Sequence, residues 1–117
     1  RSSDLLGGDS GYDAHFKKIG EKFGGFDLAI LECGQYNPYW KYIHMMPEET
    51  AMVADELRAK KFIPVHWGKF RLSLHDWDEP VRRVSAVSTF STPLFPYIGR
   101  PLSLEHEMKT DRWWEQQ

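Results

Sequence analysis

Phe26-Asp27-Leu28-Ala29-Ile30-Leu31 is a short and almost continuously apolar stretch of the sequence. Such a run is too short for a typical helix and predicts a strand that is buried on both faces. A second run of the same kind, Phe62-Ile63-Pro64-Val65, ends directly before a histidine. The two runs therefore predict the centre of a buried sheet, with polar side chains placed where its strands end.

Helical patterns and weaker strands flank these two runs. Residues 14–23 place apolar side chains at helical spacing, with lysines and a glutamate opposite them. A second helix is predicted over residues 47–61, with proline at its start and basic side chains at its end. A third is predicted over residues 78–87. Residues 5–8 indicate the end of a strand, and residues 101–104 indicate a last short strand.

Strands that alternate with helices predict an α/β layered domain. In such folds, ligands bind on loops just beyond the carboxyl ends of the strands. The length of 117 residues suits one domain, residues 1–117. Residues 105–117 have no helical or strand period, and we expect them to form an irregular tail.

Composition excludes several classes of partner. A net charge of -2 gives no electrostatic argument for nucleic acid or an anionic membrane as a partner. No apolar run approaches the roughly 20 residues of a membrane-spanning helix. Cys33 is the single cysteine, so the chain has no intrachain disulfide, and we expect a reducing, cytoplasmic location. Because no partner base lies at a fixed spacing, we expect this thiol to be buried and structural.

Three side chains lie where loops meet the predicted strands and helices. Asp9 lies in a turn between Gly8 and Gly11, where a carboxylate can ligate a metal ion or cap the following helix. His66 ends a strand, where an imidazole can ligate zinc or hydrogen-bond to backbone. His44 precedes a helix and can bind substrate, transfer a proton, act as a third ligand, or face solvent. Taken one at a time, Asp9 and His66 favour the structural roles.

The other three histidines have no such context. His15 lies on a predicted helix, His75 lies in a polar loop, and His106 lies between two glutamates. We expect all three at the surface.

Short motifs occur in a fixed order along most of the chain: GGDSGY at 7–12, FKKIGEKF at 16–23, FDLA at 26–29, MPEETA at 46–51, PVHWGKF at 64–70 and LHDWDEP at 74–80. In order and spacing they resemble the C-terminal half of metallo-β-lactamase-fold hydrolases. The nearest branch is that of N-acyl-phosphatidylethanolamine-hydrolysing phospholipase D and its bacterial relatives. The similarity covers roughly residues 7–84, which makes it far more specific than any single histidine.

The resemblance implies half of an αβ/βα sandwich, with helices packed on a mixed sheet, and a site for two zinc ions at one edge. Asp9 would bridge the two metals and His66 would ligate one of them, so both would be catalytic as well as metal-binding. His44 would contact the substrate. Tyr36 and Trp40, in the same loop as His44, are weaker candidates for the wall of the substrate pocket.

The implied activity is zinc-dependent hydrolysis, phosphodiesterase-like, with N-acyl-phosphatidylethanolamine or a related small-molecule or lipid phosphodiester as substrate. A lactonase of the same fold, or a non-catalytic binding module derived from it, is the alternative. A dinucleotide-binding oxidoreductase is disfavoured because no Gly-x-Gly-x-x-Gly follows a strand.

The chain also departs from the family pattern. The His-x-His-x-Asp-His segment, which lies in the N-terminal half of the family and supplies most ligands, is not in this sequence. Residues 32–36 (ECGQY) stand where we expect Pro-apolar-Gly-Ala-Tyr. We therefore expect this chain alone to bind zinc weakly or not at all, and to be inactive. Because half a sandwich exposes apolar surface and strand edges, we expect a homo-oligomer or association with the missing N-terminal half.

Overall fold

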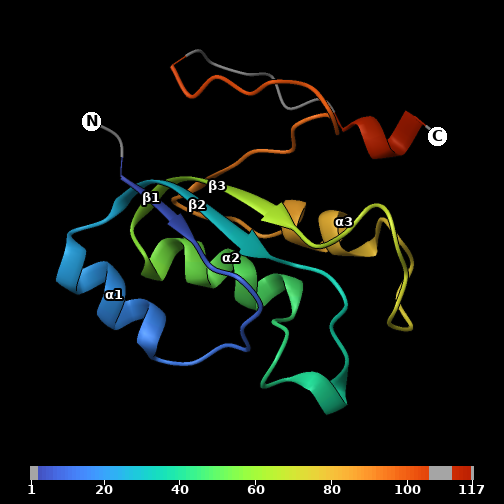
Figure 1. Cartoon of the computed structure of the whole chain (residues 1–117), viewed down its shortest axis with the longest axis horizontal. Helices are drawn as coiled ribbons and strands as arrows, with labels where there is room; N and C mark the ends of the chain where they lie inside the picture. The colour runs from blue at the N-terminus through green and yellow to red at the C-terminus, as the bar shows by residue number, and fades with distance from the viewer. Residues whose placement is uncertain (1–2, 106–111, 117) are drawn as a thin grey trace.

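The computed structural model describes residues 3–105 and 112–116. The elements follow in the order β1 (Asp4–Leu6), α1 (His15–Phe23), β2 (Phe26–Glu32), α2 (Pro47–Glu56), β3 (Ala59–Val65), α3 (Glu79–Ser85) and β4 (Thr92–Pro93). Two short 3-10 helices, η1 (Pro38–Trp40) and η2 (Trp113–Gln116), lie in the loop after β2 and near the C-terminus. The helices α1 and α2 lie on one side of the strands, and the segment at residues 95–105 crosses the other side (Figure 1).

The strands form one sheet in the order β1-β2-β3-β4. All three described pairs are parallel, with Ala29 opposite Phe62 at the centre and Leu5 opposite Ala29 at one flank. The α/β class predicted from the sequence is confirmed, but the expected mixed arrangement is wrong for the described strands. The reason is that every connection between them contains a helix, which returns the chain to the end of the sheet from which it started.

The core lies between the sheet and α2. Leu31 on β2, Phe62 on β3 and Leu57 at the end of α2 are each fully buried. Their neighbours Cys33 and Val53 are also fully buried. The two apolar runs therefore form central strands, as their sequence predicts, and Cys33 is a buried thiol, as expected.

The boundary between α2 and β3 differs from the prediction. The helix ends at Glu56 and not near residue 61, and β3 begins at Ala59. Arg58 takes a left-handed backbone conformation with φ 54°, which breaks the helix. Its carbonyl then accepts from the N–H of Phe26, so the chain enters the sheet at once.

The last strand also lies elsewhere. β4 is at Thr92–Pro93, whereas residues 101–104 form no strand. The hydroxyl of Ser91 donates to the carbonyl of Ala59 at 2.6 Å, which fixes this segment at the edge of β3. A proline is tolerated there because an edge strand has an N–H side that needs no partner.

The C-terminal residues Trp113 and Trp114 are buried, although they lie in the segment predicted to be an irregular tail. The indole of Trp113 stacks on Trp67, with ring centroids 5.3 Å apart. Residues 106–111, which include His106 and part of the predicted tail, and residue 117 lie outside the described residues.

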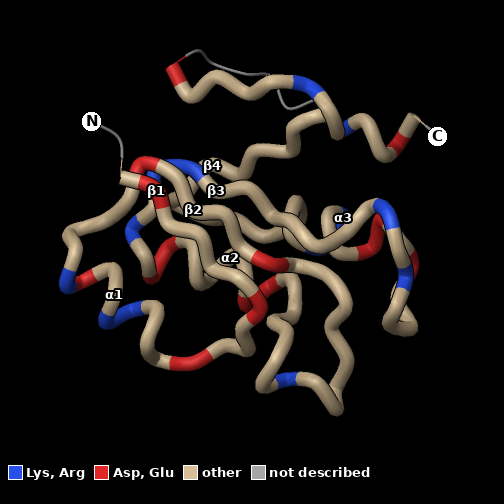
Figure 2. The backbone as a smooth tube through the Cα atoms, in the orientation of Figure 1, with Lys and Arg blue, Asp and Glu red and all other residues tan. Residues whose placement is uncertain are grey.

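Charge and helix length say little about partners. Basic and acidic positions are interspersed along the described chain (Figure 2). No helix within residues 3–105 and 112–116 is long and apolar enough to cross a membrane.

Candidate metal centre

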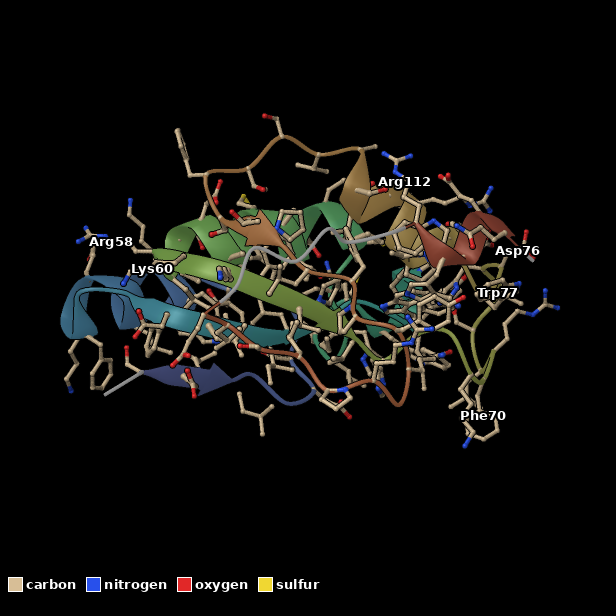
Figure 3. All side chains as sticks on the ribbon, turned by 90° about the horizontal axis from the view of Figure 1, so that it is seen from above. Arg58, Lys60, Phe70, Asp76, Trp77 and Arg112 are labelled. Carbon is tan, nitrogen blue, oxygen red and sulfur yellow. The ribbon has the colours of Figure 1, made fainter. Side chains whose placement is uncertain are left out.

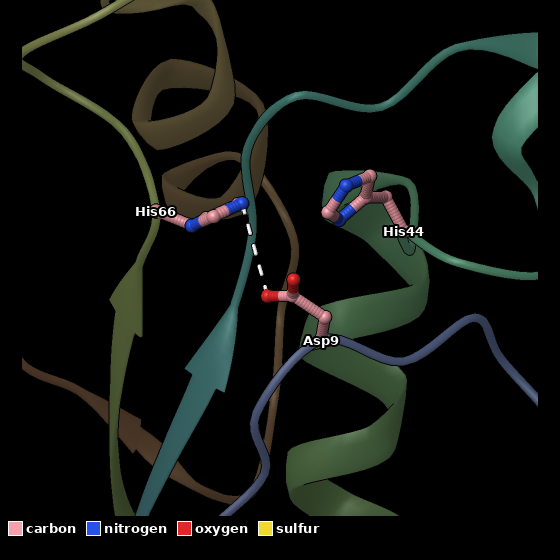
Figure 4. Close-up of side chains that lie close together, drawn as sticks. All are labelled: Asp9, His44 and His66. Carbon is pink, nitrogen blue, oxygen red and sulfur yellow. Dashed lines mark ion pairs between the residues drawn. The ribbon is translucent and has the colours of Figure 1, made fainter.

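Asp9 and His66 meet at the carboxyl-terminal edge of the sheet. Asp9 lies in the turn after β1, and His66 follows the last residue of β3. Because the strands are parallel, their carboxyl ends lie at the same edge. The carboxylate Oδ1 of Asp9 is 3.8 Å from Nε2 of His66 (Figure 4).

His44 completes a cluster of three. Asp9, His44 and His66 each offer one ligand atom, and these atoms lie within 4.8 Å of one another. The ring centroids of His44 and His66 are 5.1 Å apart. Asp9 and His66 are exposed, whereas His44 is half-buried. Two imidazoles and a carboxylate are typical ligands of zinc, so the donor set fits a divalent metal ion.

Two glycines bring the loops of this cluster into contact. A Cβ on Gly11 would lie 2.6 Å from the carbonyl carbon of Tyr42, and the Gly11 N–H donates to the Tyr42 carbonyl at 3.3 Å. A Cβ on Gly34 would lie 2.7 Å from the carbonyl carbon of His66. Both contacts are with backbone, which cannot move aside easily. The absence of a side chain at these positions therefore allows the Asp9 turn to approach the His44 loop, and the loop after β2 to approach His66.

The backbone of His66 is in the left-handed region, with φ 75°. This conformation is uncommon for a residue other than glycine, and residues strained in this way cluster at functional sites. The next residue anchors it: Trp67 donates through Nε1 to the Pro64 carbonyl at 2.8 Å and stacks on Trp113.

A carboxylate that the sequence analysis did not single out lies behind His44. Glu32, the last residue of β2, is only 2% exposed. One of its carboxylate oxygens, Oε1, accepts from the N–H of Met45, and the other, Oε2, lies 3.4 Å from Nδ1 of His44. The sequence did contain a signal, because Glu32 ends a strand that is predicted to be buried. Acidic side chains are almost never fully buried without a partner, so a glutamate at this position indicates a polar partner nearby.

Burial changes the acid–base properties of this pair. Burial, with a smaller contribution from the nearby carboxylates of Asp9 and Glu49, raises the pKa of Glu32 to about 8, against the opposing hydrogen bond from Met45. Burial and the neighbouring His66 lower the pKa of His44, although Asp9 opposes this. A neutral imidazole is therefore favoured at His44, which is the form that ligates metals or exchanges one proton with a substrate.

The two aromatic candidates of the same loop take different positions. The ring of Trp40 is 6.3 Å from that of His44, so it lies beside the cluster. Tyr36 is buried; its hydroxyl donates to Glu79 at 2.5 Å and its ring lies under the guanidinium of Arg83. These contacts direct Tyr36 toward α3.

His75 does not lie at the surface, so that prediction is wrong, whereas His15 is exposed as predicted. The ring of His75 stacks on Tyr36 at 4.3 Å, and its Nε2 accepts from the N–H of Gln35 at 2.8 Å. The side chain of Gln35 in turn accepts from the N–H groups of Leu72 and Ser73. Gln35 and His75 thus order the loop that follows His66.

An apolar pocket of about 320 Å³ adjoins the cluster. It lies between β3 and the segment after β4, and its lining includes His66, Val65, Tyr97, Ile98 and Trp113.

Comparison with known proteins identifies the family. Residues 5–67 match the family described as the Beta-lactamase superfamily domain. The outer membrane protein RomA of Klebsiella pneumoniae is 63% identical over 62 residues, which are 53% of this chain and 47% of that protein. An uncharacterised protein of Mycobacterium tuberculosis is 39% identical over 114 residues, 93% of this chain and 31% of that protein.

A relative with a named activity matches as well. N-acyl-phosphatidylethanolamine-hydrolyzing phospholipase D 1 of Caenorhabditis elegans is 42% identical over 73 residues, 60% of this chain and 20% of that protein. The chain therefore spans less than half the length of each of these three relatives. The family match, which covers more than half of the chain, shows that it belongs to the β-lactamase superfamily, among the hydrolases of the metallo-β-lactamase fold.

Proposed function

We propose that this chain forms part of the active site of a zinc-dependent hydrolase that cleaves phosphodiesters. The observation that carries the proposal is the convergence of Asp9, His44 and His66 at one edge of the sheet. The activity for which the Caenorhabditis elegans relative is named supports a phosphodiester as the substrate.

Each side chain has a role in this proposal. Asp9 and His66 hold the metal, because a carboxylate and an imidazole at strand ends are rigidly placed ligands. A bound zinc ion supplies Lewis-acid stabilisation of the charge that develops on a phosphoryl or carbonyl oxygen. His44 orients the substrate by a hydrogen bond to one of its oxygens, and the indole of Trp40 forms the adjoining wall. Tyr36 supports this loop from the side of α3.

The apolar pocket beside His66 supports a substrate with an apolar part. Its volume of about 320 Å³ and its lining of Val65, Ile98 and Trp113 suit part of an acyl chain. N-acyl-phosphatidylethanolamine or a related lipid phosphodiester has this combination of a charged phosphodiester and acyl chains. A lactone also has an apolar ring and an ester carbonyl, so a substrate comparison must include both classes.

Asp9 and His66 are too few ligands for two metal ions, even if His44 is counted as a third. Zinc sites use three or four protein ligands for each ion, so further ligands have to come from the remainder of a longer protein or from a second copy of the chain. Val65, Tyr97 and Ile98 are also at least one-third exposed beside the cluster, and an apolar surface of this kind favours a protein partner. We therefore propose that the chain alone binds zinc weakly, has no activity and self-associates, which light scattering at micromolar concentration would detect.

Calorimetric titration of the isolated chain with zinc tests the ligand assignment. We expect weak binding that His66→Ala abolishes, while His15→Ala, at an exposed position on α1, leaves it unchanged. One tight stoichiometric site on the isolated chain would contradict the proposal that the site is incomplete. Equal losses in the two variants would contradict the role of His66.

An activity screen of the natural gene product that contains this chain tests the reaction. We expect the zinc-loaded protein to hydrolyse phosphodiesters, and Asp9→Asn to abolish hydrolysis. Turnover of lactones without turnover of phosphodiesters would replace the proposed substrate class. Absence of both activities would favour a binding module. The cytoplasmic location expected from the single cysteine remains a prediction, and one relative is named an outer membrane protein.

A further inference from the structure

Glu32 is buried directly behind His44 and does not belong to the cluster of three. We propose that Glu32 is a positioning residue: it holds the His44 ring by Nδ1, so that Nε2 is presented to the site formed with Asp9 and His66. This inference rests on the proposed function, in which His44 contacts the substrate. It assigns the cause of the orientation of His44, which lies in the loop before α2, to the last residue of β2.

Three contacts fix the position of Glu32. Its backbone belongs to β2, and its carbonyl accepts from the hydroxyl of Thr50 at 2.9 Å. Its Oε1 accepts from the N–H of Met45, the residue after His44. The backbone of Glu32 is therefore held by β2 and by the first turn of α2, while its carboxylate is held by the His44 loop.

The remaining carboxylate oxygen faces His44. Oε2 of Glu32 is 3.4 Å from Nδ1 of His44, and both atoms are buried. Neither makes a hydrogen bond to any residue that the structure describes. Two buried polar atoms left without partners are costly, so a small rotation that closes the distance between them is favourable.

A bond at Nδ1 determines what the other nitrogen of the ring can do. In histidine sites, the hydrogen bond made by one ring nitrogen sets the tautomer and the direction of the other. Carboxylates commonly supply this bond behind metal-bound histidines, and their removal costs about 10- to 100-fold in metal affinity or activity. A proline at position 32, which the family resemblance leads us to expect, would have no side-chain acceptor for this purpose.

A purely structural role for Glu32 is the competing explanation. In that case the carboxylate would only satisfy the Met45 N–H and would have no influence on the His44 ring. The ring tautomer of His44 separates the two roles, because support of the backbone alone would leave it unchanged.

The test is nitrogen NMR of histidine-labelled, chelator-treated natural gene product, with the His44 signals assigned by a His44→Gln variant. Two-bond couplings between ring nitrogens and ring protons report the tautomer. We expect one tautomer in the unsubstituted protein and a mixture of both in Glu32→Leu. Glu32→Gln keeps a hydrogen-bonding group beside Nδ1 and should keep a single tautomer. Thr50→Val, which removes a hydrogen bond to the carbonyl of Glu32 and spares the carboxylate, should leave the signals unchanged.

The same variants are then assayed, zinc-loaded, with bis(p-nitrophenyl) phosphate. We expect kcat to fall about 10- to 100-fold in Glu32→Leu with little change in KM, and to recover in Glu32→Gln. A mixture of tautomers in the unsubstituted protein would overturn the proposal, even if Glu32→Leu does not fold. So would a single tautomer in Glu32→Leu. If the tautomer changes as expected but the unsubstituted protein hydrolyses no phosphodiester, the proposed function fails and the positioning role stands.

Discussion

Strand β2 carries one carboxylate near each end, and the two have opposite acid–base behaviour. Asp27, near the start, pairs with Lys60 at 2.7 Å, and the Lys60 side chain is 77% exposed. The hydrogen bond from Lys60, with further help from Ser3, lowers the pKa of Asp27. Glu32, at the other end, is only 2% exposed, and burial raises its pKa to about 8.

Burial, more than the presence of a basic neighbour, explains this difference. Each carboxylate has a basic partner, Lys60 for Asp27 and His44 for Glu32. Water surrounds the Asp27 pair but is excluded from the Glu32 pair. Arg58 and Lys60 lie at the end of the sheet opposite to Phe70, Asp76 and Trp77, which belong to the loop after His66 (Figure 3). The end with solvated charges has an ordinary surface ion pair, whereas the end with a buried carboxylate carries the candidate site.

The largest expected effect is a difference in stability between alanine substitutions of the glycines at the two ends of β2. In Gly34→Ala at the site end, the new Cβ would lie 2.7 Å from the carbonyl carbon of His66. Gly24→Ala, just before β2, meets nothing within 4 Å and adds only the strain of φ 77°. We expect Gly34→Ala to lower the free energy of unfolding by about 3 kcal/mol. The strain in Gly24→Ala should cost about 1–2 kcal/mol.

Urea denaturation of the two variants measures this difference. If Gly34→Ala were the milder substitution, the close approach of the loop after β2 to His66 would be in error.

The next effect is a dependence of stability on pH that belongs to Glu32. Its folded-state pKa of about 8 lies above its ordinary value of 4.5, so the folded state binds the proton more tightly. Protonated Glu32 therefore makes its full contribution to stability below pH 4.5, and this contribution is lost as the pH rises to about 8. His44, with an ordinary pKa of 6.5 that is lowered in the fold, is already neutral above that value. Between pH 6.5 and 8, the contribution should fall by up to about 1.4 kcal/mol per pH unit.

Unfolding of the metal-free protein at several pH values, compared with Glu32→Gln, measures this slope. The variant should gain stability relative to the unsubstituted protein as the pH rises through this window. Asp9 and Glu49, the nearby carboxylates, remain in both proteins and cancel in the comparison. Parallel stability curves for the two proteins would show that Glu32 is not buried as a protonated acid.

The smallest effect is expected at the other end of the strand. Lys60→Met removes the partner of Asp27, but an exposed ion pair contributes little to stability and is screened by salt. We expect the unfolding midpoint to change only within the scatter of repeated measurements at physiological salt. The lowered pKa of Asp27 means that any contribution is present at neutral pH and is lost as the solution is acidified. A large loss of stability in Lys60→Met that persists in high salt would contradict this expectation. It would mean that the ion pair at the start of β2 contributes as much to stability as the buried carboxylate at its end.

Local patterns predicted most of the elements. The apolar runs at 26–31 and 62–65 became β2 and β3, and proline at position 47 begins α2 as expected. They also placed Asp9 and His66 just beyond strands, and the structure brings these two groups together. The boundary at Arg58 and the position of β4 were missed, because a left-handed residue and a bond from Ser91 to Ala59 have no local apolar signature.

The sequence by itself determined the alternation of strands and helices, and hence the edge at which polar loops gather. Neighbouring residues carry that information, because apolar periodicity and turn chemistry act over a few positions. Only the tertiary structure decided that Glu32 faces His44, that Gln35 orders the loop after His66, and that His75 is buried. Burial and pairing of a polar group depend on residues far along the chain, so no local pattern specifies them.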